Sequence, residues 1–149
     1  MNYQFLANTR LFRGISVDEL EKMLTCFSVQ TRQYEKGSLI LRAGQTVSAI
    51  GLVLSGNITI ENNDLWGNRT VMDRLGAGAI FAESYALTPE EILMVDIVAN
   101  EPTEVLFLQT RAILNPCQES CYSHRALLGN LLAISSQKNL HMSRHILHT

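Results

Sequence analysis

The chain has 149 residues, of which 46% are hydrophobic and 17% charged, and its formal net charge is −2. This composition fits one folded domain with a hydrophobic core, and it lacks the basic surplus that a nucleic-acid-binding surface usually brings. No apolar run reaches the roughly 18 residues needed to span a bilayer, and the N-terminus lacks the layout of a secretory signal, so a cytoplasmic protein without membrane contact is expected.

The first predicted element is a short amphipathic helix over residues 16–27. Ser16 is followed three residues later by Glu19, which is a capping box: each side chain can satisfy a backbone N–H group at the start of a helix. Apolar residues then recur at helical spacing and define one buried face, formed by Val17, Leu20, Met23, Leu24 and Phe27.

Residues 29–108 change to short runs of β-branched and aliphatic residues, separated by glycines at 37, 44, 51, 56, 67, 76 and 78. Each glycine permits a tight turn or a positive φ, and such punctuated runs are typical of an antiparallel barrel or jelly roll. Between two of the runs, the segment NNDLWGNR predicts a hairpin connection that turns at Gly67.

Beyond Pro116 the pattern is helical again and predicts one long helix from about Gln118 to Leu147. The break at Asn115-Pro116 divides the chain into a β module, residues 1–115, and this helix, residues 116–149. The apolar stripe of the long helix is wide, so one face is expected to pack on its own domain and the other on a second copy of the chain. Burial of both faces in one core is the alternative. The predicted homodimer interface comprises Leu128, Leu131, Leu132, Ser135, Asn139 and Met142.

Three cysteines are too few for a disulfide framework, so reduced thiols are expected at Cys26, Cys117 and Cys121. Cys117 and Cys121 share one helical face with His124, and three such ligands could hold a metal or act in redox chemistry. Small buried thiols are the simpler interpretation.

The remaining motifs favour no catalytic chemistry. Histidines at 141, 145 and 148 share a helical face, where a solvated polar surface is preferred to a zinc site because a carboxylate or cysteine ligand is missing. The sequence contains no nucleophile elbow, Walker loop, HExxH motif or dinucleotide fingerprint, so an enzyme is not expected.

In its order of helix, glycine-punctuated strands, short internal helix and long C-terminal helix, the sequence resembles the cyclic-nucleotide-binding domain of the Crp/Fnr family of bacterial transcription regulators. Four segments carry the resemblance: YEKGSLILRAGQ, IGLVLSGNITI, GAGAIFAE and VDIVANEPTEVLFL. The resemblance implies a mainly β fold, an antiparallel β-roll of jelly-roll type, with a short N-terminal helix and a long C-terminal dimerisation helix.

Family members that bind cyclic AMP carry a cassette that reads approximately Gly-Glu, a spacer, and then Arg-Ser/Thr-Ala. The glutamate takes the ribose hydroxyl, and the arginine pairs with the cyclic phosphate. In this chain Ala82 and Glu83 occupy the first pair of positions, and Leu93-Met94-Val95 occupy the second set. The resemblance thus implies an effector pocket lined by Ala82, Glu83, Ser84, Leu93, Met94 and Val95, in which the glutamate is kept and the arginine is lost.

The loss of the arginine changes what this pocket can bind. A phosphate monoanion taken out of water needs a charge partner, and neither an aliphatic chain nor a thioether replaces the two charge-assisted hydrogen bonds of arginine. Although a helix N-terminus near Ser84 attracts anions, the carboxylate of Glu83 repels them. Cyclic AMP binding of the usual kind is therefore not expected, and the cavity either accepts a less anionic effector or is filled by its own side chains.

The sequence therefore predicts the effector-sensing and dimerisation domain of a Crp/Fnr-like regulator, and it does not identify a cofactor. Related regulators carry a winged helix-turn-helix module after the long helix, and this chain ends at HMSRHILHT with the helical pattern still running. DNA contact is expected through a module beyond residue 149. Two alternatives remain: a metal- or redox-responsive sensor that uses Cys117, Cys121 and His124, and a stand-alone ligand-binding module.

Overall fold

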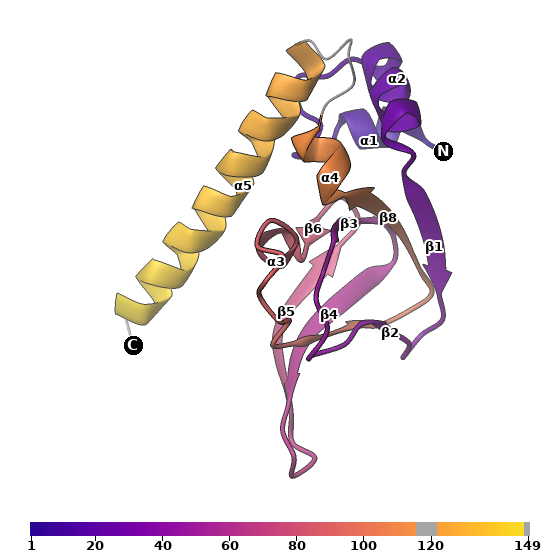
Figure 1. Ribbon diagram of the computed structural model, residues 1–149. Helices are drawn as coiled ribbons and strands as arrows, with labels where there is room; N and C mark the ends of the chain where they lie inside the picture. Colours follow the sequence, from indigo (N-terminus) through magenta and orange to yellow (C-terminus); the bar gives the residue numbers. More distant parts are fainter. Residues whose placement is uncertain (116–121, 148–149) are drawn as a thin grey trace.

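Two four-stranded antiparallel sheets form a β-roll, with helices at one end and along one side (Figure 1). The structure, a computed structural model, describes residues 1–115 and 122–147, the last of these from residue 141 by backbone only. The first sheet has the order β1 (Gln30–Tyr34), β8 (Thr103–Gln109), β3 (Ala49–Ser55) and β6 (Ile80–Phe81). The second has the order β2 (Leu39–Leu41), β7 (Asp96–Ala99), β4 (Asn57–Asn63) and β5 (Arg69–Gly76). The predicted antiparallel β-roll is confirmed.

The central strands β3 and β8 of the first sheet are covered on both faces, which explains their runs of apolar residues, whereas the edge strand β1 is polar and largely exposed. Side chains alternate along a strand, so Val53 and Val105 point into the roll toward the second sheet. Their neighbours Leu52 and Leu106 point the other way, into a second core under the helices. This sheet therefore carries the hydrophobic contacts between the β-roll and the helical layer.

The helices in the described part of the chain are α1 (Tyr3–Ala7), α2 (Val17–Phe27), α3 (Glu83–Ala86), α4 (Thr110–Leu114) and α5 (Tyr122–Leu147). Helix α2 begins as predicted, because the Ser16 side chain accepts a hydrogen bond from the Glu19 backbone N–H at 3.3 Å. The reciprocal half of the capping box differs: the Glu19 carboxylate accepts from the Ser123 hydroxyl of α5. Glu19 thus ties α2 to the long helix.

The hairpin of β4 and β5 projects away from the roll (Figure 1). Its connection turns at Gly67, with φ of +85°, as predicted. The Asp64 carboxylate accepts from the backbone N–H groups of Trp66, at 2.9 Å, and Asn68, at 2.8 Å. The Asn68 side chain donates to it as well, and these bonds hold the pKa of Asp64 below its usual value.

The long helix α5 runs down one side of the molecule, past α3 (Figure 1). It packs on its own domain through Leu127, Leu131 and Ile134, which are all buried in the core. The burial of Leu131, which is 4% exposed, corrects its assignment to the dimer interface, because a core side chain is not available to a partner. Among the described helices, none combines the length and apolar character needed to cross a membrane.

Several short elements escaped prediction. Helices α1 and α4 and strand β6 are each five residues or fewer, too short for a periodic pattern to emerge. The run 92–99 forms a strand only from Asp96, because its first half makes only an isolated bridge, between Thr46 and Ile92, and no continuous ladder. Cys26 is disulfide-bonded, so the expectation of a reduced thiol is wrong for this residue.

Candidate functional site

A cavity of about 200 Å³ lies between the β-roll, helix α3 and helix α5. Its apolar walls come from three separate segments of chain, and its polar groups come from α3 and α5. The residues that line it are Ile60, Phe81, Ala82, Glu83, Ser84, Tyr85, Leu93, Val95, Ile97 and Lys138.

One wall of the cavity depends on a glycine in β3. The ring of Phe81 lies against Gly51, where an added Cβ would stand 2.2 Å from the ring carbon Cζ. A side chain at this position would push Phe81 toward the cavity or distort the β3–β6 pair. Gly51 therefore sets the position of the aromatic wall.

Helix α3 begins at the cavity with an unusual backbone conformation. Ala82 precedes the helix in the left-handed region, with φ of 64° and ψ of 13°, which costs an L-residue about 1–2 kcal/mol. This turn directs Glu83 inward from the start of α3, so that the residue is only 3% exposed. A strained residue beside a buried carboxylate is typical of a functional site.

The Glu83 carboxylate pairs with a lysine from the far end of the sequence. Lys138 of α5 places its Nζ 2.5 Å from Glu83 Oε1 and donates a further hydrogen bond, at 3.1 Å, to the backbone carbonyl of Ile80. A buried carboxylate without a partner is costly, so this pair stabilises α5 against the roll. Lys138 therefore joins the cavity wall to the long helix.

Leu93 closes the cavity at the position that corresponds to the cassette arginine, and it is 1% exposed. Its backbone is fixed from both sides, because its N–H donates to Gln45 at 2.9 Å and its carbonyl accepts from Gly44 at 2.8 Å. The Asp96 carboxylate accepts from the Ala43 N–H of the same turn, and this bond holds the pKa of Asp96 below its usual value of 3.8. Leu93 is thus held firmly in the wall.

Most of the predicted pocket residues meet at this cavity. Ala82, Glu83, Ser84, Leu93 and Val95 line it. Met94 does not: it is 77% exposed, because adjacent residues in extended chain point to opposite sides, and its prediction as a lining residue is corrected.

Sequence reasoning missed the residue that changes the electrostatics of the cavity, Lys138. A signal for it exists, since residue 138 follows Ile134 by four positions and Leu131 by seven, and therefore lies on the helical face that packs against the domain. The apolar lining residues Ile60 and Ile97 were not predicted for another reason: they lie on strands outside the cassette segment.

The remaining interface residues lie on a different side of α5. Leu132 is 69% exposed, Asn139 is exposed, and Leu128 and Ser135 are partly buried. The side chain of Met142 lies outside the described residues. The exposed part of the predicted interface is therefore centred on Leu132.

The proposed metal ligands are only partly described. His124 packs edge-on against Phe27, with ring centroids 6.3 Å apart, and its Nδ1 is buried without a hydrogen-bond partner among the described residues. Cys117, Cys121 and His148 lie outside the described residues, as do the side chains of His141 and His145. Within the described part of the chain, no three potential ligands cluster as a metal site would require.

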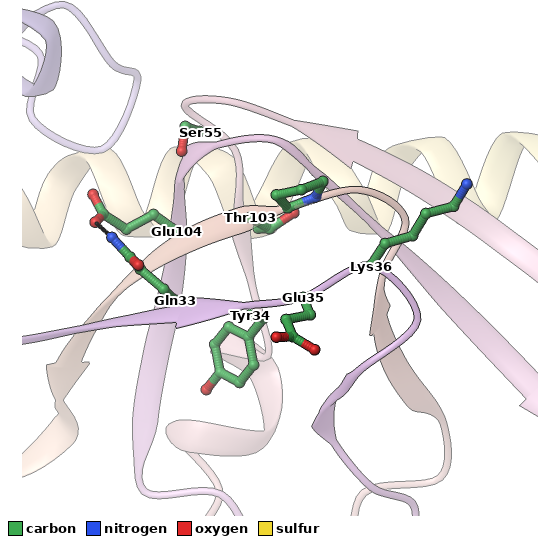
Figure 2. A pocket seen from close by; sticks show the side chains of 8 residues that line it. Gln33, Tyr34, Glu35, Lys36, Ser55, Thr103 and Glu104 are labelled. Atoms are coloured by element: carbon green, nitrogen blue, oxygen red, sulfur yellow. Dashed lines mark hydrogen bonds between the residues drawn. The ribbon is translucent and has the colours of Figure 1, made fainter.

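A broader concavity, of about 580 Å³, lies at the far end of β1 (Figure 2). Gln33 donates to Glu104 at 3.2 Å across it, whereas Lys36 points away from that pair (Figure 2). None of the predicted pocket residues lines it, and its side chains do not converge on one point. The smaller cavity beside α3 is therefore the better candidate site.

Comparisons with known proteins identify the family to which this fold is similar. A family model described as the cyclic nucleotide-binding domain matches residues 31–120. The cyclic AMP receptor protein of Thermus thermophilus is 34% identical over 98 residues, which are 66% of this chain and 44% of that protein. The chain thus spans less than half the length of that curated relative.

Two solved structures are similar over nearly the whole chain. The catabolite activator protein of Thermus thermophilus has a TM-score of 0.75 and 26% identity, covering 93% of this chain and 62% of that one. The sensor domain of the transcriptional regulator DNR from Pseudomonas aeruginosa has a TM-score of 0.73 and 18% identity, covering 98% of this chain and 91% of that one. The second likeness concerns the fold alone.

Proposed function

The chain belongs to the cyclic nucleotide-binding domain family, and from this premise we propose that it is the effector-sensing and dimerisation domain of a Crp/Fnr-like DNA-binding transcription regulator. Its role is effector binding rather than catalysis, in the cytoplasm, and its effector is not cyclic AMP bound in the usual way. DNA is contacted by a module outside this chain. The names of the similar receptor and activator proteins support this assignment.

The observation that carries the proposal is the contact between Glu83 and Lys138. It links the wall of the cavity, in α3, directly to α5, the helix expected to meet a second copy. An effector that alters this contact has different affinities for two placements of α5, which is the physical requirement for a regulatory domain.

The chemistry of the cavity argues against a cyclic phosphate. Leu93 offers no donor where the family's arginine would stand, and Lys138 is the only cationic residue among those lining the cavity. Its ammonium group is already paired with Glu83. A cyclic phosphate would have to break that pair to reach the Lys138 ammonium. It would then lie beside the Glu83 carboxylate, now without its partner, which repels it.

Dimerisation is proposed through the side of α5 that does not face its own domain. Leu132 is 69% exposed there, and Leu128, one turn before it, lies at the edge of this side, because it is partly buried and also packs against the core of its own domain. Burial of an exposed leucine side chain under a second helix is favourable and would stabilise the dimer. The proposed interface is formed by Leu128, Leu132, Ser135, Asn139 and Met142.

Sedimentation of the purified chain tests the dimer. Leu132→Glu places a charge in the proposed interface, and we expect a shift from dimer to monomer at micromolar concentration. Leu65→Glu is the matched control, because Leu65 is 99% exposed at the tip of the β4–β5 hairpin and should leave the dimer intact. A monomeric parent chain, or equal effects of both variants, would contradict the proposed interface.

Thermal unfolding in the presence of cyclic AMP tests the effector assignment. A ligand at a hundred times its dissociation constant stabilises a protein by about 2.7 kcal/mol, so millimolar cyclic AMP should raise the melting temperature measurably if it binds in the micromolar range. We expect no rise. A clear rise that is lost in Glu83→Gln would show that the usual ligand binds despite Leu93.

A further inference from the structure

The two members of the Glu83–Lys138 pair are unequally held. The Glu83 side chain is 4% exposed, whereas that of Lys138 is 43% exposed. Glu83 is fixed at the start of α3 beside the strained Ala82, whereas lysine carries its ammonium on a flexible stem. The carboxylate is therefore the permanent feature of the cavity, and the ammonium is its exchangeable counter-ion.

The position of the Lys138 ammonium has the properties of a binding site for another ammonium. Two acceptors converge there, Glu83 Oε1 at 2.5 Å and the Ile80 carbonyl at 3.1 Å. The walls around them are mostly apolar and are formed by Ile60, Phe81, Leu93, Val95 and Ile97. Acceptors at one end of an apolar cavity select a cation with an apolar body.

We propose that this cavity binds a small primary alkylammonium compound, whose ammonium replaces that of Lys138 on Glu83 and on the Ile80 carbonyl. The cavity volume of about 200 Å³ suits a short hydrocarbon body, since it equals roughly seven water molecules. Displaced Lys138 no longer holds α5 against α3. This consequence, unlike the binding itself, rests on the proposed function, because it matters only if α5 forms the dimer.

Lys138 acts as a built-in competitor of such a ligand. A tethered group has an effective concentration in the millimolar range or above, and a free amine must exceed it to displace the lysine. Butylammonium is therefore expected to bind the parent chain weakly. It should bind Lys138→Ala at least about tenfold more tightly, because the competitor is gone and the cavity is enlarged.

Chemical rescue of Lys138→Ala is the test. The variant leaves Glu83 without its partner, so its melting temperature should fall. Butylammonium chloride at 50 mM should restore about half of the loss or more by taking the vacated position. Butan-1-ol, which has the same apolar body without the charge, and sodium butyrate, which has the opposite charge, should not restore it.

Three variants make the result specific. The double variant Glu83→Gln with Lys138→Ala should show no rescue by butylammonium. Arg125→Ala removes an exposed cation from the same helix and should neither lower the melting temperature comparably nor respond to the amine. If Lys138→Ala does not fold, Lys138→Gln provides the same test with a neutral side chain of similar length.

Three outcomes would overturn the proposal. Equal rescue by butan-1-ol would mean that the cavity is only being filled, and stabilisation of the parent chain by butyrate would identify Lys138 as an anion site. Absence of rescue in both lysine variants would show that Glu83 accepts no external ammonium. Each concerns the cavity alone, whereas the Leu132→Glu sedimentation test concerns α5 alone, so failure of one proposal is distinguishable from failure of the other.

Discussion

Among the residues that the structure describes, two carboxylates are buried, and their ion pairs join residues at very different separations in the sequence. Glu61 and Glu83 are each 3% exposed, and each pairs with a half-exposed cation, Arg69 at 2.6 Å and Lys138 at 2.5 Å. The Glu61 pair joins residues eight apart within the β4–β5 hairpin, whereas the Glu83 pair joins residues 55 apart, on α3 and α5. Of the two pairs, the second connects the α3 wall of the cavity to the long helix α5, so a change in the cavity can alter how α5 is held.

The two carboxylates also differ in what remains when the cation is removed. Glu61 keeps a hydrogen bond from the Thr59 hydroxyl at 2.5 Å. For Glu83, Lys138 is the only side-chain donor among the described residues. Loss of the lysine therefore leaves a buried carboxylate without a side-chain donor, whereas after loss of the arginine Thr59 still donates to Glu61. This asymmetry suits Glu61 to a structural role and Glu83 to a switchable contact.

Replacement of the cation by methionine at each pair measures the difference, since methionine keeps the aliphatic stem. The larger effect is expected for Lys138→Met, which should lower the free energy of unfolding by about 3 kcal/mol, the low end for breaking a buried pair. Urea denaturation at neutral pH measures it. Restoration of stability in the double variant Glu83→Gln with Lys138→Met would confirm that the unpaired charge is the cause; a single-variant loss below about 1 kcal/mol would contradict it.

The corresponding change in the hairpin, Arg69→Met, should cost only about 1 kcal/mol, because Thr59 still donates to Glu61 and the exposed arginine is screened by water. The same urea denaturation measures this. Helix α5 lies outside the hairpin, so the proposed dimer should be unaffected. A loss equal to that of Lys138→Met would mean that the hydrogen bond from Thr59 does not offset the loss of the cation.

The pH dependence of Arg69→Met gives a second measurement of the same pair. Arg69 holds the pKa of Glu61 below its usual value of 4.5, followed by a smaller effect in the same direction from Thr59. The unfolded chain therefore binds the proton more readily, so the pair stabilises the fold above pH 4.5 and this contribution is lost as the pH falls through the lowered pKa. Between pH 5 and pH 3 the parent chain should lose more stability than Arg69→Met.

The same comparison explains what the sequence could and could not reveal. The hairpin was predictable, because its strands, Asp64 and Gly67 are neighbours in sequence and their turn chemistry is local. Glu83 was found through the family motif. Lys138 was missed: its helical spacing places it on the side of α5 that faces the domain, but no sequence pattern shows that it pairs with a residue 55 positions away. Leu131 was misplaced for a related reason: a wide apolar stripe does not say which side faces the core.

The smallest expected effect concerns the backbone beside Glu83. Ala82 occupies the left-handed region, which glycine enters freely, so Ala82→Gly should raise the free energy of unfolding by up to about 1 kcal/mol after the greater entropy of glycine is offset. Ser28→Gly is the matched control, because Ser28 has a similar conformation, φ of 53°, at the end of α2 and far from the cavity in sequence.

Both glycine variants should be stabilised in thermal unfolding, and the penalty of Lys138→Met should be the same in either background within about 0.5 kcal/mol. A larger penalty in the Ser28→Gly background than in the Ala82→Gly background would mean that the strained alanine helps to hold Glu83 against Lys138. In that case the strained backbone at Ala82 is part of what forms the Glu83–Lys138 contact. If Lys138→Met costs the same in both backgrounds, the strain at Ala82 serves only to turn the chain from β6 into α3 and has no effect on the contact.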